Sequence, residues 1–298
     1  MTPSWFWIVF TIFAAAGQTA RNTMQRKLTA ELGATGATQV RFLFGFPFAL
    51  LFLTGLVVLA HQALPHPAAI FWFSDFTGAI TQILGTALML LLMEERSFVV
   101  ATAYIKTEPV FVAIFGLVIM GDLLTPAMTI AIAICVVGVI VLSVDPKRGV
   151  GSPREAMLGI ASGAFFGMSA IGFRGAILSL HNPNYVMAAT FTLTLGLLMQ
   201  SVVLTFWLAI RSPRVLRGLA RLWRPSLLAG LMGSAASEMW FLAFALTSAA
   251  NVRTLGLIDV AFAQAVSRFV FGHRTTRREY AGIALLLAGA ILLVVVHR

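Results

Sequence analysis

Four charged side chains stand within otherwise apolar stretches of this sequence, where charges are costly and usually have a role. Lys106 and Glu108 lie two residues apart in residues 103–122, while Glu238 and Asp259 lie in apolar stretches of the second half. A site with charges of both signs would suit a zwitterion better than a purely cationic compound. One of the carboxylates could also carry a coupling proton. The alternative is a network of structural ion pairs that fixes the helices.

Three further residues near these charges could shape a binding site. Tyr104 precedes Glu108 by four residues and would share its face of a helix. Trp240 lies away from the ends of its apolar stretch, so an interfacial aromatic belt does not explain it. We therefore predict that Tyr104 and Trp240 line a cavity, although core positions explain them equally well. Pro109 removes a backbone donor and is predicted to act as a helix hinge.

The composition shows what kind of element must position these residues. Of the 298 residues, 59% are hydrophobic and 11% are charged, whereas a soluble domain carries about 25% charged residues. Apolar runs of bilayer-spanning length recur along the chain, and they lack the alternation of barrel strands. The sequence therefore predicts an all-α polytopic membrane protein.

The apolar runs and their breakers predict ten transmembrane helices. These fall near residues 4–25, 35–60, 70–93, 98–120, 125–144, 156–178, 184–210, 226–246, 250–272 and 280–297. The stretch 145–155, "DPKRGVGSPRE", is the polar linker between a first repeat, residues 1–144, and a second repeat, residues 156–298.

The two predicted halves resemble each other at a nearly constant offset. A shift of 151 residues superposes Glu108 on Asp259 and Gly138 on Gly289, and a shift of 150 superposes Gly17 on Gly167. A five-helix repeat is odd-numbered, so the second copy must be inverted in the membrane. Inverted repeats are typical of secondary transporters with a site near the membrane midplane. Glu108 and Asp259 would then approach the same central region.

Ten charges fall inside the predicted spans: Arg21, Arg41, Asp75, Lys106, Glu108, Arg174, Glu238, Arg253, Asp259 and Arg268. Each would cost about 2.5–3.5 kcal/mol at the centre of a lipid-facing helix, so they should face protein or a water-filled cavity. We expect Asp75, Arg174 and Arg253 to lie nearest the span ends and to snorkel.

Basic residues are concentrated on one side of the predicted membrane domain. The connections after the odd-numbered spans hold fourteen Lys and Arg residues, and the other side holds only Arg298. The positive-inside rule then puts both termini outside the cytoplasm. The asymmetry accounts for the net charge of +10 without a nucleic-acid partner. The densest cluster, Arg214, Arg217, Arg221 and Arg224, predicts a short interfacial helix against anionic lipid.

The sequence lacks the motifs of several enzyme classes. The five histidines have no metal-ligand spacing, a single cysteine excludes an internal disulfide, and no P-loop or nucleophile elbow occurs. We expect no catalytic residues, no metal and no cofactor.

The predicted architecture resembles the drug/metabolite transporter superfamily, in particular its EamA-type exporters. The motifs of that family repeat are a Pro in the fourth helix, a Gly-Glu pair at the next turn and a Gly in the fifth helix. Here Pro109, Gly121-Asp122 and Gly138 stand in the first half, with Asp in place of Glu. The second half keeps Gly272 and Gly289, with Val260 and His273 in the other two places.

The resemblance implies secondary transport of small organic solutes, with YddG-type aromatic amino-acid exporters as the nearest type. Many members are described with cytoplasmic termini, which the charge count here opposes. The sequence hypothesis is therefore an exporter of amino acids, aromatic or hydrophobic ones favoured, in the bacterial inner membrane, with a monomer left open. A cationic drug exporter, or a membrane-embedded enzyme or lipid-handling protein, are the alternatives.

Overall fold

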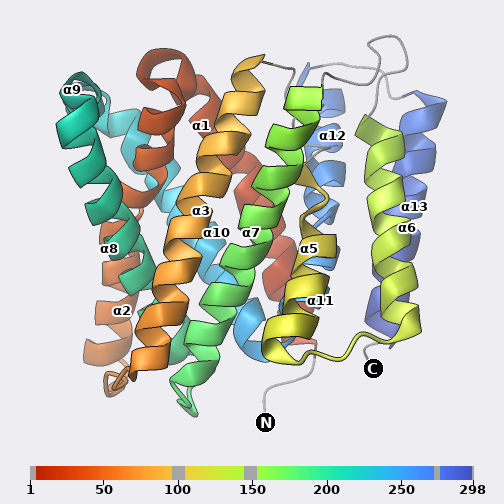
Figure 1. The fold of residues 1–298 in the computed structure, drawn as a ribbon, viewed down its shortest axis with the longest axis horizontal. Helices are drawn as coiled ribbons and strands as arrows, with labels where there is room; N and C mark the ends of the chain where they lie inside the picture. The colour runs from red at the N-terminus through yellow and green to blue at the C-terminus, as the bar shows by residue number, and fades with distance from the viewer. Residues whose placement is uncertain (1–4, 96–104, 144–152, 272–275, 297–298) are drawn as a thin grey trace.

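The computed structural model describes residues 5–95, 105–143, 153–271 and 276–296. These residues are helical apart from short connections, and no strand occurs within them. The long helices stand side by side, with their axes running between the same two ends of the molecule (Figure 1). This is the arrangement expected where each spanning segment must satisfy its own backbone hydrogen bonds.

In chain order, the described elements fall into one series before residues 144–152 and one series after them. The first contains α1 (Phe6–Leu43), α2 (Phe46–Val58), α3 (Ala69–Glu95), α5 (Glu108–Phe115), the π-helical turn η1 (Gly116–Met120) and α6 (Pro126–Ser143). The second contains α7 (Pro153–Ser179), α8 (Tyr185–Arg211), α9 (Pro213–Arg221), α10 (Trp223–Leu246), α11 (Ala249–Leu255), α12 (Ile258–Phe271) and α13 (Arg277–Val296).

Five helical segments in the described ranges are long and apolar enough to cross a membrane: Leu28–Val58, Ala69–Met93, Pro153–Ser179, Tyr185–Arg211 and Trp223–Leu246. Shorter apolar helices occupy Glu108–Met120, Pro126–Val141 and Tyr280–Val296. The chain is therefore an all-helical membrane protein with several spans.

The first helix differs from the prediction. We expected a loop between spans 4–25 and 35–60, but α1 is helical up to Gly33 and resumes directly after it. Gly33 adopts a φ of +67°, which favours glycine and breaks the helical path. Polar residues do not end a helix by themselves, so the break occurs at the glycine instead of at the charged residues before it. The second predicted span consists of the end of α1 followed by α2.

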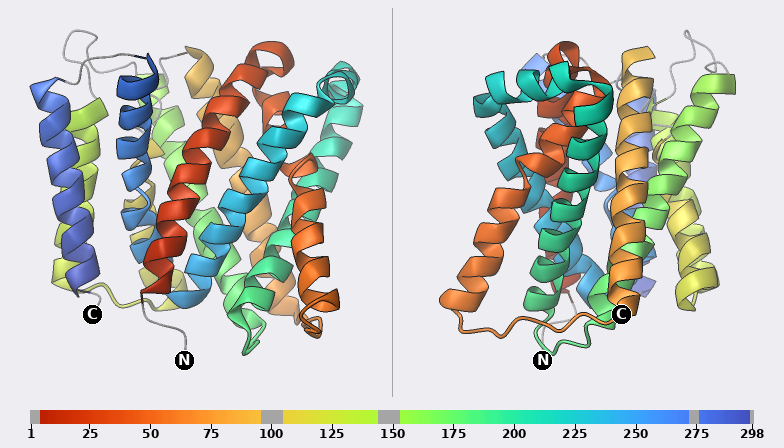
Figure 2. Two further views of the ribbon diagram at one scale, coloured as in Figure 1. Left: turned by 180° about the vertical axis from the view of Figure 1, so that it is seen from behind. Right: turned by 60° about the vertical axis from the view of Figure 1, so that its left-hand side comes forward.

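Helices far apart in the sequence pack against each other. The most extensive contacts pair α1 with α10, α3 with α7, and α6 with α13. The α6–α13 pair stands at one edge of the bundle in Figure 1 and in the left view of Figure 2. There, a Cβ on Gly138 would lie 2.7 Å from the Leu286 nitrogen, and a Cβ on Gly289 would lie 2.9 Å from the Ala131 oxygen. The two glycines allow this close crossing.

The two ends of the bundle differ in charge. The start of α1 and the end of α13 lie at one end, and α9 lies at the other (Figure 1). Three of the clustered arginines lie in the short helix α9, with Leu219 buried, and Arg224 lies at the start of α10; the interfacial position of α9 stays a prediction. The four clustered arginines are exposed: Arg214, Arg217, Arg221 and Arg224. Their contact with anionic lipid stays a prediction.

Candidate functional site

Two helical segments are interrupted near the predicted central region. Ile105 is helical, and a turn at residues 106–107 separates it from α5, which begins at Glu108. Pro109 lies in the first turn of α5. Its ring would clash with the carbonyl of Ile105 in a continuous helix, and it offers no N–H to that carbonyl. Pro109 therefore fits the start of a new helix, and the hinge predicted there corresponds to a break just before it.

The second interruption lies at residues 256–257, between α11 and α12. No proline is present, but Gly256 lies directly against the ring of Trp240. A Cβ at position 256 would approach Trp240 Cη2 to 2.4 Å. Only a glycine lets the indole come this close to the backbone.

Ion pairs connect the two interruptions. Lys106 Nζ lies 2.5 Å from Asp259 Oδ2, and Arg253 Nε lies 3.0 Å from Glu108 Oε1. Lys106 and Glu108 thus point in different directions, as their spacing predicts, and each finds its partner on the other interrupted helix. All four side chains are largely buried. Removing one member would leave its partner charged and unpaired in the interior.

A chain of polar contacts extends this cluster to α1 and α10. Gln18 donates to Asp259 Oδ2 at 3.2 Å and accepts from Trp240 Nε1 at 3.2 Å. The guanidinium carbon of Arg253 lies 4.5 Å from the Trp240 ring centroid and 5.2 Å from that of Phe244. This distance is that of a cation–π contact. Trp240 is therefore held by a hydrogen bond from its Nε1 to Gln18 and by the Arg253 guanidinium over its ring.

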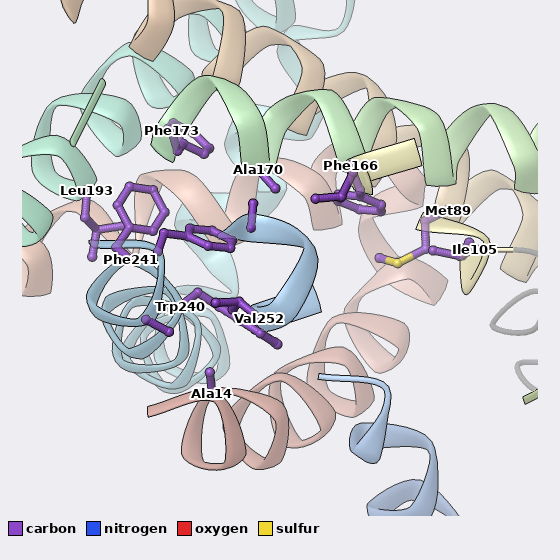
Figure 3. Packing of buried hydrophobic residues seen from close by; sticks show 14 of the residues in the cluster. Ala14, Met89, Ile105, Phe166, Ala170, Phe173, Leu193, Trp240, Phe241 and Val252 are labelled. Atoms are coloured by element: carbon purple, nitrogen blue, oxygen red, sulfur yellow. The ribbon is translucent and has the colours of Figure 1, made fainter. Parts of the chain in front are cut away.

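A cavity opens beside these groups, with about 60 Å³ of space for the centres of water-sized molecules. Its polar lining comprises Gln18, Thr19, Arg21, Asn22, Arg41, Gln82, Lys106, Glu108, Ser237, Arg253 and Asp259. Its apolar lining comprises Met89, Met93, Ile105, Phe166, Trp240, Phe241 and Val260. Met89, Ile105 and Phe166 lie close together, and Trp240 lies next to Val252 (Figure 3). A few polar groups within an apolar and aromatic wall are typical of a small-molecule site.

Comparison with known proteins agrees with this membrane architecture. Residues 5–144 match the family model described as EamA-like transporter family. The family that this segment matches consists of membrane transporters of small solutes. Its members are generally not enzymes.

Structural similarity to a known protein extends beyond residue 144. A solved structure described as "Crystal structure of protein" is 13% identical and superposes with a TM-score of 0.71. The alignment covers 99% of this chain and 96% of that chain. At this identity the likeness concerns the fold alone. A search of the curated proteins finds no match.

The cavity brings together four of the predicted site residues: Lys106, Glu108, Trp240 and Asp259. Glu238 does not belong to the lining. Its Oε1 accepts from Thr190 Oγ1 at 2.5 Å, and its Oε2 has no hydrogen-bond partner. Tyr104 lies outside the described residues. A substrate-binding role for all six residues stays a prediction.

Of the three charges expected to snorkel, Asp75 and the side chain of Arg253 are buried, and Arg174 is part-buried. Asp75 is fully buried, and neither carboxylate oxygen has a hydrogen-bond partner. Arg174 pairs with Asp122 at 3.0 Å, which joins α7 to the family Gly-Asp turn. Arg253 belongs to the cavity cluster. The burial of these charges therefore depends on which neighbouring helices they contact, and not on how near they lie to a helix end.

The sequence interpretation did not select Arg21 and Arg41 as site residues. Both line the cavity, and both are buried, with 3% and 5% of their surface exposed. The signal was present, because both belong to the ten charges inside predicted spans. Within the described residues, no three His, Cys, Asp or Glu side chains form a metal-binding group.

Proposed function

We propose that this chain is a secondary transporter that moves small organic solutes, amino acids favoured, through the described cavity by alternating access. The observation that carries the proposal is the pair of interrupted helices, joined by two ion pairs at the wall of one cavity. Interrupted spans at corresponding positions of two halves are the strongest structural pointer to a transport site.

The proposed architecture has ten spans in two inverted repeats, residues 1–144 and 156–298, separated by a linker at 145–155. The breaks at 106–107 and 256–257 differ by 150 residues, close to the offset of the sequence alignment. Adding 151 to Ala131, Cys135 and Gly138 gives Gly282, Leu286 and Gly289. These residues meet reciprocally across the α6–α13 crossing. Reciprocal contacts at one offset support a pseudo-twofold axis.

The helix pairings support the same axis. If α1 corresponds to α7 and α3 to α10, the pairing of α1 with α10 and that of α3 with α7 become equivalent contacts. Each such pair joins one half to the other. Movement of the halves would then have to separate Lys106 from Asp259 and Arg253 from Glu108.

The lining favours an amino acid or a related metabolite over a lipophilic cation. Trp240, Phe241 and Phe166 offer apolar and aromatic surface for a side chain. Among the described lining residues, four basic groups stand against two carboxylates, and both carboxylates are already paired. The net positive charge of this lining would repel a cationic drug. The same pairing leaves these carboxylates poorly placed for general acid–base chemistry. We place the chain in the bacterial inner membrane, with both termini outside the cytoplasm.

The test is uptake of a labelled amino-acid panel into proteoliposomes, with and without internal unlabelled solute and with and without a proton gradient. Saturable uptake of one subset, absent from empty liposomes and accelerated by internal solute, is expected. Exposed Arg214→Gln serves as the matched control and should behave like the unmodified protein. No uptake of any amino acid in protein that remains helical and monodisperse would overturn the amino-acid assignment. Chemical alteration of the solute would instead favour an enzyme.

A further inference from the structure

Two arginines of α1 line the cavity without an acidic partner. Arg21 and Arg41 lie on either side of the Gly33 break, and both approach Gly233 of α10. A Cβ on Gly233 would lie 3.2 Å from Arg21 Cδ and 3.9 Å from Arg41 Cγ. Glycine at this position leaves room for both side chains. The two positive charges are close enough to repel each other.

The donors of both guanidinium groups are only partly used. Arg21 donates from Nε and Nη2 to the same oxygen, Asn22 Oδ1, at 3.3 and 2.9 Å, and its Nη1 has no partner. Arg41 donates from Nη1 to Thr86 Oγ1 at 3.3 Å, and its Nε has no partner. In the part of the chain that the structure describes, neither has a carboxylate oxygen within 4 Å.

The carboxylates of the cavity attract these charges only from a distance, Asp259 acting on Arg21 and Glu108 on Arg41, and both already stand in ion pairs. Glu108 is paired with Arg253, and Asp259 is bound by both Lys106 and Gln18. Buried charges are normally paired, and guanidinium donors left unsatisfied in the interior are costly. An arrangement of this kind is stable where a counter-anion enters from outside the chain.

We propose that Arg21 and Arg41 form the subsite for the oxyanion of the transported solute, a carboxylate or a phosphate. This inference rests on the proposed function, because it treats the cavity as the transport site. Guanidinium groups present parallel N–H donors that match the two oxygens of a carboxylate or phosphate. Met89, Phe166 and Phe241 line the same cavity and would accept the apolar part of the solute.

The test compares phenylalanine with four probes of the same ring: phenylalaninamide, phenethylamine, 3-phenylpropanoate and phenyl phosphate. Binding is read from ligand-induced thermal stabilisation in detergent, and transport from competition with labelled phenylalanine in proteoliposomes. We expect the probes that carry an oxyanion to bind. The amide and the amine should bind at least about tenfold more weakly than phenylalanine, because they lack charge-assisted hydrogen bonds to arginine. Stronger binding of phenyl phosphate than of 3-phenylpropanoate would identify phosphate as the source.

Variants assign the effect to the two arginines. Arg21→Gln and Arg41→Gln should each weaken binding of oxyanion probes at least about tenfold and leave amine binding within about twofold. Arg41→Lys keeps the charge but loses the planar donor geometry, so it should fall between Arg41→Gln and the unmodified protein. Arg214→Gln, exposed on α9, is the matched control. The melting temperature of each variant, measured without ligand, shows whether the variant is folded.

The outcomes separate this inference from the proposed function. If phenylalanine and its amide bind and move equally well, and both glutamine variants behave like the unmodified protein, the oxyanion subsite is wrong although transport stands. If oxyanion probes stabilise the protein through Arg21 and Arg41 but nothing is transported, the subsite stands and the transport proposal fails. If no oxyanion probe stabilises folded protein at millimolar concentration, the subsite is overturned.

Discussion

The ion pair between Lys106 and Asp259 gives the sharpest test of how the two interrupted helices are held together. At 2.5 Å, two unit charges attract by about 6–7 kcal/mol if the effective dielectric constant is about 20. Part of this attraction offsets the cost of desolvating both groups. Lys106→Met removes one charge and leaves the Asp259 carboxylate with the Gln18 donor alone. We therefore expect Lys106→Met to lower the free energy of unfolding by about 3–5 kcal/mol.

The double variant Lys106→Met, Asp259→Asn removes both charges and leaves no buried ion without a partner. It should be more stable than Lys106→Met, because well-packed neutral groups often replace a buried pair at little cost. The coupling energy of the cycle should then be at least about 2 kcal/mol. Reversible unfolding in mixed detergent, followed by helicity, gives each free energy, and exposed Arg217→Met is the control. A cost below about 1 kcal/mol for Lys106→Met, with additive effects in the double variant, would refute this reasoning.

Three further predictions concern tight or unpaired buried positions. Gly256→Ala should lower the free energy of unfolding by about 1–3 kcal/mol, because the added methyl group overpacks against Trp240. Combining it with Trp240→Phe should restore most of that loss. Asp75→Asn should leave the melting temperature unchanged or raised, because it removes a buried group that can be charged and whose two oxygens lack partners. Gly138→Ala should force α6 away from the backbone of α13 and speed labelling of Cys135, the single cysteine, by a thiol reagent.

Each of these predictions has a result that contradicts it. If Gly256→Ala lowers the free energy of unfolding equally in the unmodified protein and in Trp240→Phe, the contact with Trp240 is not the cause. A clear loss of thermal stability in Asp75→Asn would mean that the carboxyl group has a stabilising role that the amide cannot fill. Unchanged labelling of Cys135 in Gly138→Ala, measured beside a Gly55→Ala control with open space around its Cβ, would contradict the close crossing.

Hydropathy located much of the helical structure because apolar length is a local property of the chain. The predicted span 184–210 corresponds to α8, Tyr185–Arg211, and 70–93 corresponds to α3, Ala69–Glu95. The loop predicted before residue 35 was wrong, since helix continuity depends on backbone conformation, and the decisive residue was Gly33. Whether a charged residue lies within a helix or beyond its end is not visible in hydropathy.

The candidate site could be predicted in part for a different reason. Charges within a membrane must face protein or water, so buried Lys106, Glu108 and Asp259 were found by elimination. Which charge meets which partner depends on the rotation of each helix and on its depth relative to helices far away in the sequence. For this reason Arg253 was expected at a helix end, and the unpaired environment of Arg41 was not foreseen.

The charges around the cavity separate into two groups that would respond differently to a solute. Two ion pairs link the interrupted helices, and each consists of one residue from each half of the chain. The arginines of α1 have no such partner and would gain one only when an oxyanion enters. That oxyanion would also bring negative charge beside Lys106 and Arg253, which line the same cavity, and could replace part of the attraction that holds them to Asp259 and Glu108. A solute that binds to one group and weakens the other has the differential affinity for two conformations that alternating access requires.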